Sequence, residues 1–329
     1  MTLREVSART RGVERQVVML RTLVPHLLRT APVRLALTHG PLSSAVVDRF
    51  VAGGTEQDAV AAVVRLAGGG LRASVDLLGE GVLGAQDAHG TVEAYLRLLA
   101  VADQHGVAAG LDVSVKLSAL GQAVPRDGQA VSASNAALIA ARAQSLGATI
   151  TLDMEDHTTT DATLTTLVQL RRDFPTVGAV VQAQLRRTEA DCRDLARAGS
   201  RVRLCKGAYL EPASLAHQGR RAVSASYARC LGILMAGPGY PMIATHDPEL
   251  LELTGRLVRH LDRPAASYEY QLLFGVRPAE QRRLAAAGAT VRVYLPYGPD
   301  CVPYLSRRVV EKPANLLLAL HAASDRAAR

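Results

Sequence analysis

The amino-acid sequence predicts an α/β fold, a closed barrel of eight parallel strands with a helix after each strand. Short apolar runs typical of strands alternate eight times with segments of helical spacing, over about 250 residues, the usual size of such a (β/α)8 barrel. No linker rich in Pro, Gly or Ser interrupts the alternation, which indicates a single domain over residues 1–329. An open, doubly wound sheet is the alternative arrangement of the same elements.

The first 68 residues come before this alternation and predict a helical extension. Apolar side chains recur at helical spacing over residues 15–28. A second helix is expected to open at residues 55–58 and to stop at the three glycines 68–70.

The barrel is expected over residues 69–322. Its strands are expected at 71–78, 111–117, 149–154, 178–183, 201–207, 241–246, 267–273 and 290–296. The helices that follow them are expected at 91–104, 134–146, 160–174, 189–197, 214–235, 249–261, 278–287 and 301–322.

Composition and charge exclude several classes of protein. Hydrophobic residues make up 48% of the chain and charged residues 21%, so the chain is globular with a sizeable core. The net charge of +8 rests almost wholly on dispersed arginines without interleaved aromatic residues, which argues against nucleic-acid binding and is compatible with an anionic membrane surface. No run of about 18 apolar residues and no apolar signal segment occurs, so we expect a cytoplasmic protein.

Charged side chains stand inside one of the expected strands. Arg203 and Lys206 lie in the apolar run 201–207, where unpaired burial is expensive, and Gly207 then allows a turn. The other expected strands also carry polar residues at their carboxyl ends, where barrel enzymes hold their chemistry. This set is Glu80, Lys116, Asp153, Glu155, Gln182, Gln184, Arg203, Lys206, Thr245, His246, Glu269, Gln271 and Tyr294.

Each of these residues alone is compatible with a structural ion pair or a satisfied core histidine, but polar groups on all eight strands together indicate a site. The four cysteines and the histidines lack the spacing of metal ligands, so no metal is expected, and no GxSxG nucleophile is found. A mixed cationic, amide and hydroxyl lining suits an organic cofactor and a small anion. The glycines 79, 81 and 84 match GxGxxG, but the acidic residue of a dinucleotide-binding fold is missing.

The last expected helix has a conspicuous face. Tyr304, Arg307, Arg308 and Glu311 follow the spacing i, i+3, i+4, i+7 and therefore lie on one side. Two guanidinium groups suit a carboxylate, which they bind by paired hydrogen bonds. An ordinary solvated face with an intrahelical ion pair is the alternative.

Together these segments resemble the proline dehydrogenase family in its small, single-function bacterial form. The matching segments lie in the family's order between residues 70 and 315, and Arg203-Leu-Cys-Lys-Gly-Ala-Tyr209 and Tyr304 to Glu311 are specific in combination. The others are 113–118, 152–155, 181–183, 244–246, 268–273 and 292–298. The chain departs from relatives at Leu210 and Cys301, where an aromatic residue and Trp are usual, so flavin packing and closure of the last helix are expected to differ in detail.

The resemblance implies a distorted (β/α)8 barrel with the last helix over its mouth and a noncovalent FAD. It implies oxidation of L-proline to Δ1-pyrroline-5-carboxylate, the first step of proline catabolism to glutamate, with hydride passing to flavin N5. Electrons would pass to a membrane quinone, so the protein is expected at the inner face of the cytoplasmic membrane. The product would pass to a separate pyrroline-5-carboxylate dehydrogenase.

The resemblance also implies roles for individual residues. Asp153 and Arg203 are the expected catalytic pair, with Arg203 near flavin N5. The expected substrate-binding residues are Lys116, Arg307, Arg308, Tyr294, Tyr304, Leu273 and Tyr209. The expected FAD contacts are Met154, Gln182, Arg203, Lys206, Gly207, Ala208, Thr245, His246, Gln271 and Glu311.

Two other functions remain compatible with the residues. One is a phosphate-binding aldolase or isomerase that uses Lys116 or Lys206 as a Schiff base. The other is a non-catalytic proline-binding or scaffold protein, although the complete set of charged site residues argues against a decayed site.

Overall fold

The computed structural model describes residues 47–301 and 304–305. Residues 52–298 form one compact unit, and residues 1–51 and 299–329 are grouped in a second one. The predicted helix 15–28 and nearly all of the predicted helix 301–322 lie outside the described residues. The single domain, and the last helix over the barrel mouth, therefore stay predictions.

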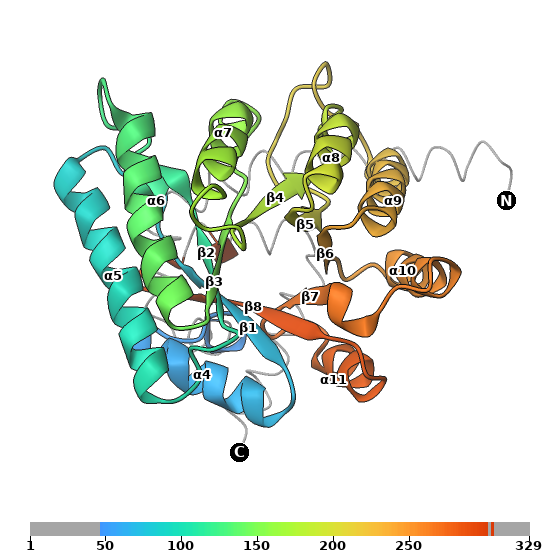
Figure 1. Ribbon diagram of the computed structural model, residues 1–329, viewed down its shortest axis with the longest axis horizontal. Coiled ribbons are helices and arrows are strands. Elements are labelled where there is room, and N and C mark those ends of the chain that lie inside the picture. The colour runs from blue at the N-terminus through green and yellow to red at the C-terminus, as the bar shows by residue number, and fades with distance from the viewer. Residues whose placement is uncertain (1–46, 302–303, 306–329) are drawn as a thin grey trace, which may run out of the picture. The chain divides into compact units, whose positions relative to one another are not determined.

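The larger unit is a closed barrel of eight parallel strands. Each strand pairs with its neighbour in sequence, and β1 closes the barrel against β8 (Figure 1). The strands are β1 (Arg72–Leu77), β2 (Asp112–Val115), β3 (Thr149–Leu152), β4 (Gly178–Gln182), β5 (Arg201–Cys205), β6 (Tyr240–Ala244), β7 (Glu269–Leu273) and β8 (Val291–Tyr297). This arrangement confirms the predicted (β/α)8 fold.

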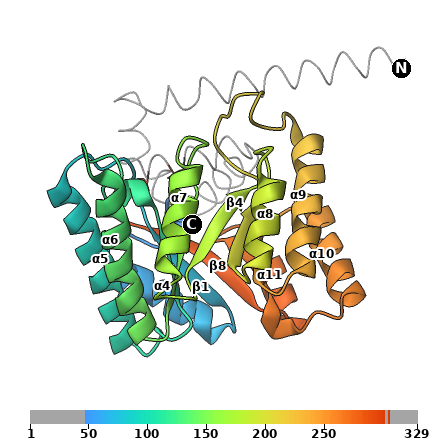
Figure 2. The ribbon, with the colours of Figure 1, turned by 45° about the horizontal axis from the view of Figure 1, so that its top comes forward.

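Helices lie outside the strands in both views (Figures 1 and 2). They are α4 (Glu56–Gly68), α5 (Ala85–Gln104), α6 (Gly128–Ser145), α7 (Thr160–Leu170), α8 (Thr188–Arg197), α9 (Arg220–Ala236), α10 (Pro248–His260) and α11 (Pro278–Ala286). Helix α4 begins where predicted, because the Thr55 hydroxyl accepts a hydrogen bond from the backbone of Asp58 while the Asp58 carboxylate accepts one from the backbone of Thr55.

Three connections differ from the predicted boundaries. Helices α5 and α6 begin about two turns earlier than expected, since the Ala and Gln residues before the apolar stripe also favour helix. Helix α9 begins at Arg220 and not at residue 214, because Gly219 adopts a φ of 81° that ends the preceding loop. That loop, residues 206–219, pairs its backbone with the β4–α8 connection and reaches past the upper ends of α8 and α9 (Figure 2).

The apolar core lies between the strands and the helices. Alternate strand residues such as Val113, Ile150 and Leu204 are buried there with helix residues such as Leu98 and Ile139. The intervening strand positions face the barrel interior, and many of them are polar or charged. The interior of this barrel is therefore stabilised by hydrogen bonds and ion pairs.

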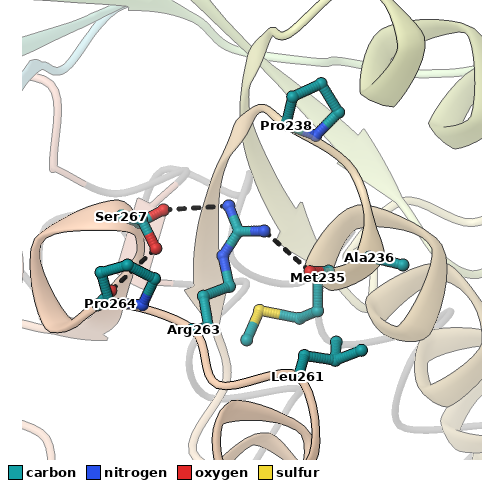
Figure 3. A pocket seen from close by; sticks show the side chains of 7 residues that line it. All are labelled: Met235, Ala236, Pro238, Leu261, Arg263, Pro264 and Ser267. Carbon is teal, nitrogen blue, oxygen red and sulfur yellow. Dashed lines mark hydrogen bonds between the residues drawn. The ribbon is translucent and has the colours of Figure 1, made fainter.

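A single arginine joins two connections at the amino ends of β6 and β7. One Nη atom of Arg263 donates to the carbonyl oxygens of Met235 and Gly237, each at 2.7 Å, and the other donates to those of Gly239 and Ser267. Arg263 lines a pocket of about 290 Å³ (Figure 3) whose walls are Met235, Ala236, Pro238, Leu261, Arg263, Pro264 and Ser267. Because the Nη donors are taken by backbone carbonyls, we interpret this arginine as a clamp between the two connections.

We predict that Arg263→Ala lowers the free energy of unfolding by about 2–4 kcal/mol, since charge-assisted hydrogen bonds to four partly buried carbonyls are lost. The free energy of unfolding of Arg263→Lys is expected to lie between those of the parent protein and Arg263→Ala, because an ammonium lacks the planar fork that reaches both connections. Chemical denaturation measures the effect, and the exposed Arg282→Ala on α11 is the matched control. Equal stabilities of Arg263→Ala and Arg282→Ala would contradict the clamp.

Candidate active site

The interior of the barrel carries four basic and four acidic side chains. Their charges balance, and each acidic side chain is within ion-pair distance of a basic one. The set is Lys116, Arg201, Arg203 and Arg292 with Asp76, Asp112, Asp153 and Glu269. Pairing of this kind is required because an isolated buried charge costs several kcal/mol.

The lowest pair is Glu269 with Arg292, near the amino ends of the strands. Arg292 Nε lies 2.7 Å from Glu269 Oε1, and both side chains are buried. Burial alone would raise the pKa of Glu269, but Arg292, Gln271 and Arg201 together outweigh burial, and the pKa falls below its ordinary value of 4.5. The prediction that Glu269 lies at a carboxyl end was wrong, because it is the first residue of β7.

Arg203 occupies the middle of the interior, and the protein engages all five of its N–H donors. Its Nε donates to Gln271 Oε1 at 2.6 Å. One Nη donates to Ser114 Oγ at 2.6 Å and to Asp153 Oδ1 at 2.8 Å, and the other to Ser74 Oγ at 2.8 Å and to Asp112 Oδ2 at 3.0 Å. Arg203 and Gln271 are thus interior residues within β5 and β7, which corrects their predicted place at the strand ends.

Above Arg203, Lys116 and Asp153 approach the open end of the barrel. Lys116 Nζ pairs with Asp76 Oδ1 and lies 3.8 Å from Asp153 Oδ2. The Tyr294 hydroxyl donates to Asp153 Oδ2 at 2.7 Å, and the Arg203 guanidinium lies 5.1 Å from the centre of the Tyr294 ring. The structure therefore brings together Lys116, Asp153, Arg203 and Tyr294, which the sequence had placed on four different strands.

Burial and neighbouring charges shift the pKa values of Lys116, Tyr294 and Asp76. Burial favours a lower pKa for Lys116, but Asp76 and Asp153 outweigh it and raise the pKa, so the amine is an ammonium. Burial raises the pKa of Tyr294 well above its usual range, with Asp153 adding to the effect, so the phenol keeps its proton. Burial also raises the pKa of Asp76, against the opposing effect of Lys116.

The rim beside β5 and β6 carries a second group of polar residues. Lys206 Nζ lies 2.7 Å from Asp247 Oδ2 and 2.8 Å from Ser224 Oγ, while Arg220 Nη lies 3.8 Å from the same carboxylate. Two cations against one carboxylate leave one net positive charge. Gly207 adopts a φ of 101°, and a Cβ there would lie 2.4 Å from the Gln184 side chain. A cationic rim with a close backbone approach fits the diphosphate of a dinucleotide.

The other predicted FAD contacts lie around this rim or beside it. The Thr245 hydroxyl accepts from the Asp247 N–H at 3.1 Å, and His246 Nε2 accepts from the Leu273 N–H at 3.0 Å. Gln182 ends β4 and donates to the Glu155 carbonyl at 2.6 Å. Met154 is buried after β3, whereas Ala208 is exposed in the β5–α9 loop.

The remaining predicted substrate residues are only partly placed. Leu273 ends β7, and Tyr209 lies in the β5–α9 loop with its carbonyl accepting from Gln184. Tyr304 is described as a buried residue of the second unit. Arg307, Arg308 and Glu311 lie outside the described residues.

Three acidic residues of the site were missed from the sequence. Asp76 and Asp112 are buried in β1 and β2, and Asp247 caps α10. Asp76 shares the signal that singled out Lys116, a charge within an apolar strand. Asp112 is the first residue of its strand, so a search limited to the carboxyl ends of the strands does not find it. Asp247 precedes Pro248, a common helix start.

Within residues 47–301 and 304–305, no three His, Cys, Asp or Glu side chains gather as metal ligands would. In the same part of the chain, no helix combines the length and apolar character needed to cross a membrane.

The fold is a (β/α)8 barrel, a class whose enzymes hold their sites at the carboxyl ends of the strands, and its interior is charged. A family model described as proline dehydrogenase matches residues 59–317. Proline dehydrogenase 1 of Bacillus subtilis is 33% identical over 272 residues, which cover 83% of this chain and 88% of that protein. Proline dehydrogenase of Deinococcus radiodurans is 36% identical, over 82% of this chain and 87% of that protein. The chain belongs to the proline dehydrogenase family.

Solved structures agree on the fold. Proline utilization A from Bdellovibrio bacteriovorus, inactivated by N-propargylglycine, superposes with a TM-score of 0.75 at 22% identity over 82% of this chain. This chain spans about a third of that protein, 33% of its length. Bifunctional protein PutA of Escherichia coli is 27% identical, and the match covers 23% of its length.

We predict that Glu269→Gln changes the pH dependence of stability. The lowered pKa of Glu269 means that its pair with Arg292 stabilises the fold above about pH 4.5 and that this stabilisation is lost as the pH falls through the folded-state pKa. At pH 7 the variant is expected to be less stable by about 3–5 kcal/mol, because Arg292 stays buried without its partner.

Urea denaturation between pH 7 and pH 3 measures this difference, which is expected to shrink as the pH falls. Glu252→Gln, at a side chain that is 74% exposed on α10, is the matched control. Parallel stability curves for Glu269→Gln and the parent over this pH range would refute the prediction.

Proposed function

We propose that this protein oxidises L-proline to Δ1-pyrroline-5-carboxylate with a noncovalent FAD. The observation that carries the proposal is the cluster of Lys116, Asp153, Arg203 and Tyr294 at the open end of the barrel, in a chain of this family. The curated relatives named above are proline dehydrogenases by name.

Lys116 binds the substrate carboxylate in this proposal, together with Arg307 and Arg308. Its ammonium state supports this role, and it argues against Lys116 as the lysine of a Schiff base, which needs a neutral amine. The ion pair of Lys116 with Asp76 fixes the direction of the ammonium before the substrate binds. Tyr294, Leu273, Tyr209 and Tyr304 form the walls around the proline ring.

The rim residues hold the FAD. Lys206 would face the diphosphate, and Gly207 and Ala208 would allow its close approach. The rim residues Gln182, Thr245 and His246 would complete the contacts, together with Met154, the interior residue Gln271, and Glu311. When bound, FAD supplies the two-electron acceptor for the carbon next to the proline nitrogen. The described residues fit such a group through the net positive charge around Lys206 and the positive φ of Gly207.

Asp153 and Arg203 act as the catalytic pair. Asp153 is held by Arg203, Ser114 and Tyr294, so its carboxylate has little freedom to turn. Arg203 supplies a fixed positive charge that favours negative charge gathering on a bound electron acceptor. All five of its donors already have protein partners, so a hydrogen bond from Arg203 to the cofactor requires one of them to change partner.

We expect the purified protein to be yellow and to lose that colour when L-proline is added without oxygen. Acid precipitation is expected to release the flavin into the supernatant, since no His or Cys stands in a known attachment motif. A proline-dependent dye reduction assay and the visible spectrum measure both effects. A colourless protein in which borohydride links a carbonyl substrate covalently to a lysine would overturn the proposal. A yellow protein that does not react with proline would overturn the oxidation and leave only a binding role.

The electrons pass to a membrane quinone and the product to a separate pyrroline-5-carboxylate dehydrogenase. The protein therefore works at the inner face of the cytoplasmic membrane, and its net charge of +8 supplies attraction to anionic lipid.

We expect the protein to sediment with vesicles that contain anionic lipid and to be released by added salt, because screening weakens surface attraction. Zwitterionic vesicles are the control. Sedimentation that resists salt, or none at low salt, would argue against an electrostatic contact.

A further inference from the structure

We propose that Asp112 is a positioning residue of the proline-oxidising site. Its buried carboxylate fixes the Arg203 guanidinium and offsets part of its charge. The proposal rests on the function proposed above, because Arg203 is assigned there to the catalytic pair.

The carboxylate of Asp112 is held on both oxygens. Its Oδ1 accepts from the hydroxyls of Thr149 at 2.8 Å and Thr151 at 2.9 Å. Its Oδ2 accepts from Ser74 Oγ at 2.6 Å and from Arg203 Nη at 3.0 Å. The side chain is fully buried, so its position is fixed by these four donors and not by water.

Arg203 is shared between two carboxylates on different strands. One Nη pairs with Asp153 at the open end of the barrel, and the other pairs with Asp112 at the start of β2. Asp112 opposes the pull of Asp153 on the guanidinium. Without the Asp112 charge, the ion pair of Arg203 with Asp153 would remain, and the interior would become more positive by one charge.

The charge of Asp112 serves the interior as a whole, because this carboxylate lies within ion-pair distance of Arg201 as well as of Arg203. A neutral amide of the same shape would keep one accepting oxygen but would place an NH2 donor where the second oxygen now accepts hydrogen bonds from hydroxyls. The charge has a consequence that an amide lacks, because it lowers the electrostatic potential around Arg203. A lower potential disfavours electron uptake by an acceptor held there.

The test is Asp112→Asn in the FAD-loaded protein. We expect the midpoint potential of the bound flavin, measured by spectroelectrochemistry, to shift to more positive values. We expect kcat with proline to fall by about tenfold or more because the catalytic pair is displaced, while KM changes less than about threefold because Lys116 is untouched. Thr149→Val removes one hydroxyl from the same carboxylate without a change of charge, and it is expected to keep the parent potential.

A second variant covers the case in which Asp112→Asn does not fold. The hydroxyl of Thr151 lies against both oxygens of Asp112, so Asp112→Asn with Thr151→Asp returns a carboxylate to the same place. This double variant is expected to restore the parent potential and most of kcat. A folded double variant whose potential stays shifted would overturn the role of the charge.

The parent protein separates the two proposals. If the parent neither holds FAD nor oxidises proline, the proposed function fails. If the parent does both and Asp112→Asn keeps its potential and kcat, only the role of Asp112 is overturned. A potential shifted equally by Thr149→Val would also overturn it, because loss of a hydrogen bond would then suffice.

Discussion

The hydrogen bonds of Arg203 are the interaction on which the interior of this barrel depends. One guanidinium on β5 contacts Ser74 of β1, Asp112 and Ser114 of β2, and Gln271 of β7, as well as Asp153 directly after β3. A side chain of this kind is costly to bury, and the cost is offset only when every donor meets an acceptor. The same contacts that satisfy Arg203 therefore hold five parts of the barrel in register and place Asp153 at its open end.

Much of the fold could be predicted from the local sequence pattern, because eight alternating strand and helix segments are compatible with only a few arrangements of parallel strands. The strand boundaries were predicted within a few residues. Lys116, Asp153, Arg203 and Tyr294 lie close together, although Arg203 and Tyr294 stand within their strands and not at the strand ends. Glu269 was placed at the wrong end because the polar residues of its strand were all assigned to the carboxyl end, although it is the first residue of β7. Asp76 and Asp112 were missed because only strand ends were considered. Every second residue faces the interior, and a search of those positions finds both of them.

Other features depend on contacts that a single segment does not encode. The loop 206–219 was read in part as helix, yet its backbone bonds with the β4–α8 connection and the φ of Gly219 fix it as a loop. The pairing of Asp112 with Arg203 joins residues 91 positions apart, and no periodicity within either strand predicts it. The positions of Arg307, Arg308 and Glu311 relative to this cluster rest on the family resemblance.

The long sequence separations within the charged interior also bear on how the chain folds. Arg292 of β8 donates to the carbonyl of Ala73 in β1, 219 positions earlier, and Arg203 of β5 reaches Ser74 in β1, 129 positions earlier. Until the last strand closes against the first, some of these charges have no partner in a dry interior. A half-formed barrel is therefore disfavoured relative to both the open chain and the complete one, so closure is cooperative and slow. The paired charges of the interior and the completed barrel therefore form in the same event.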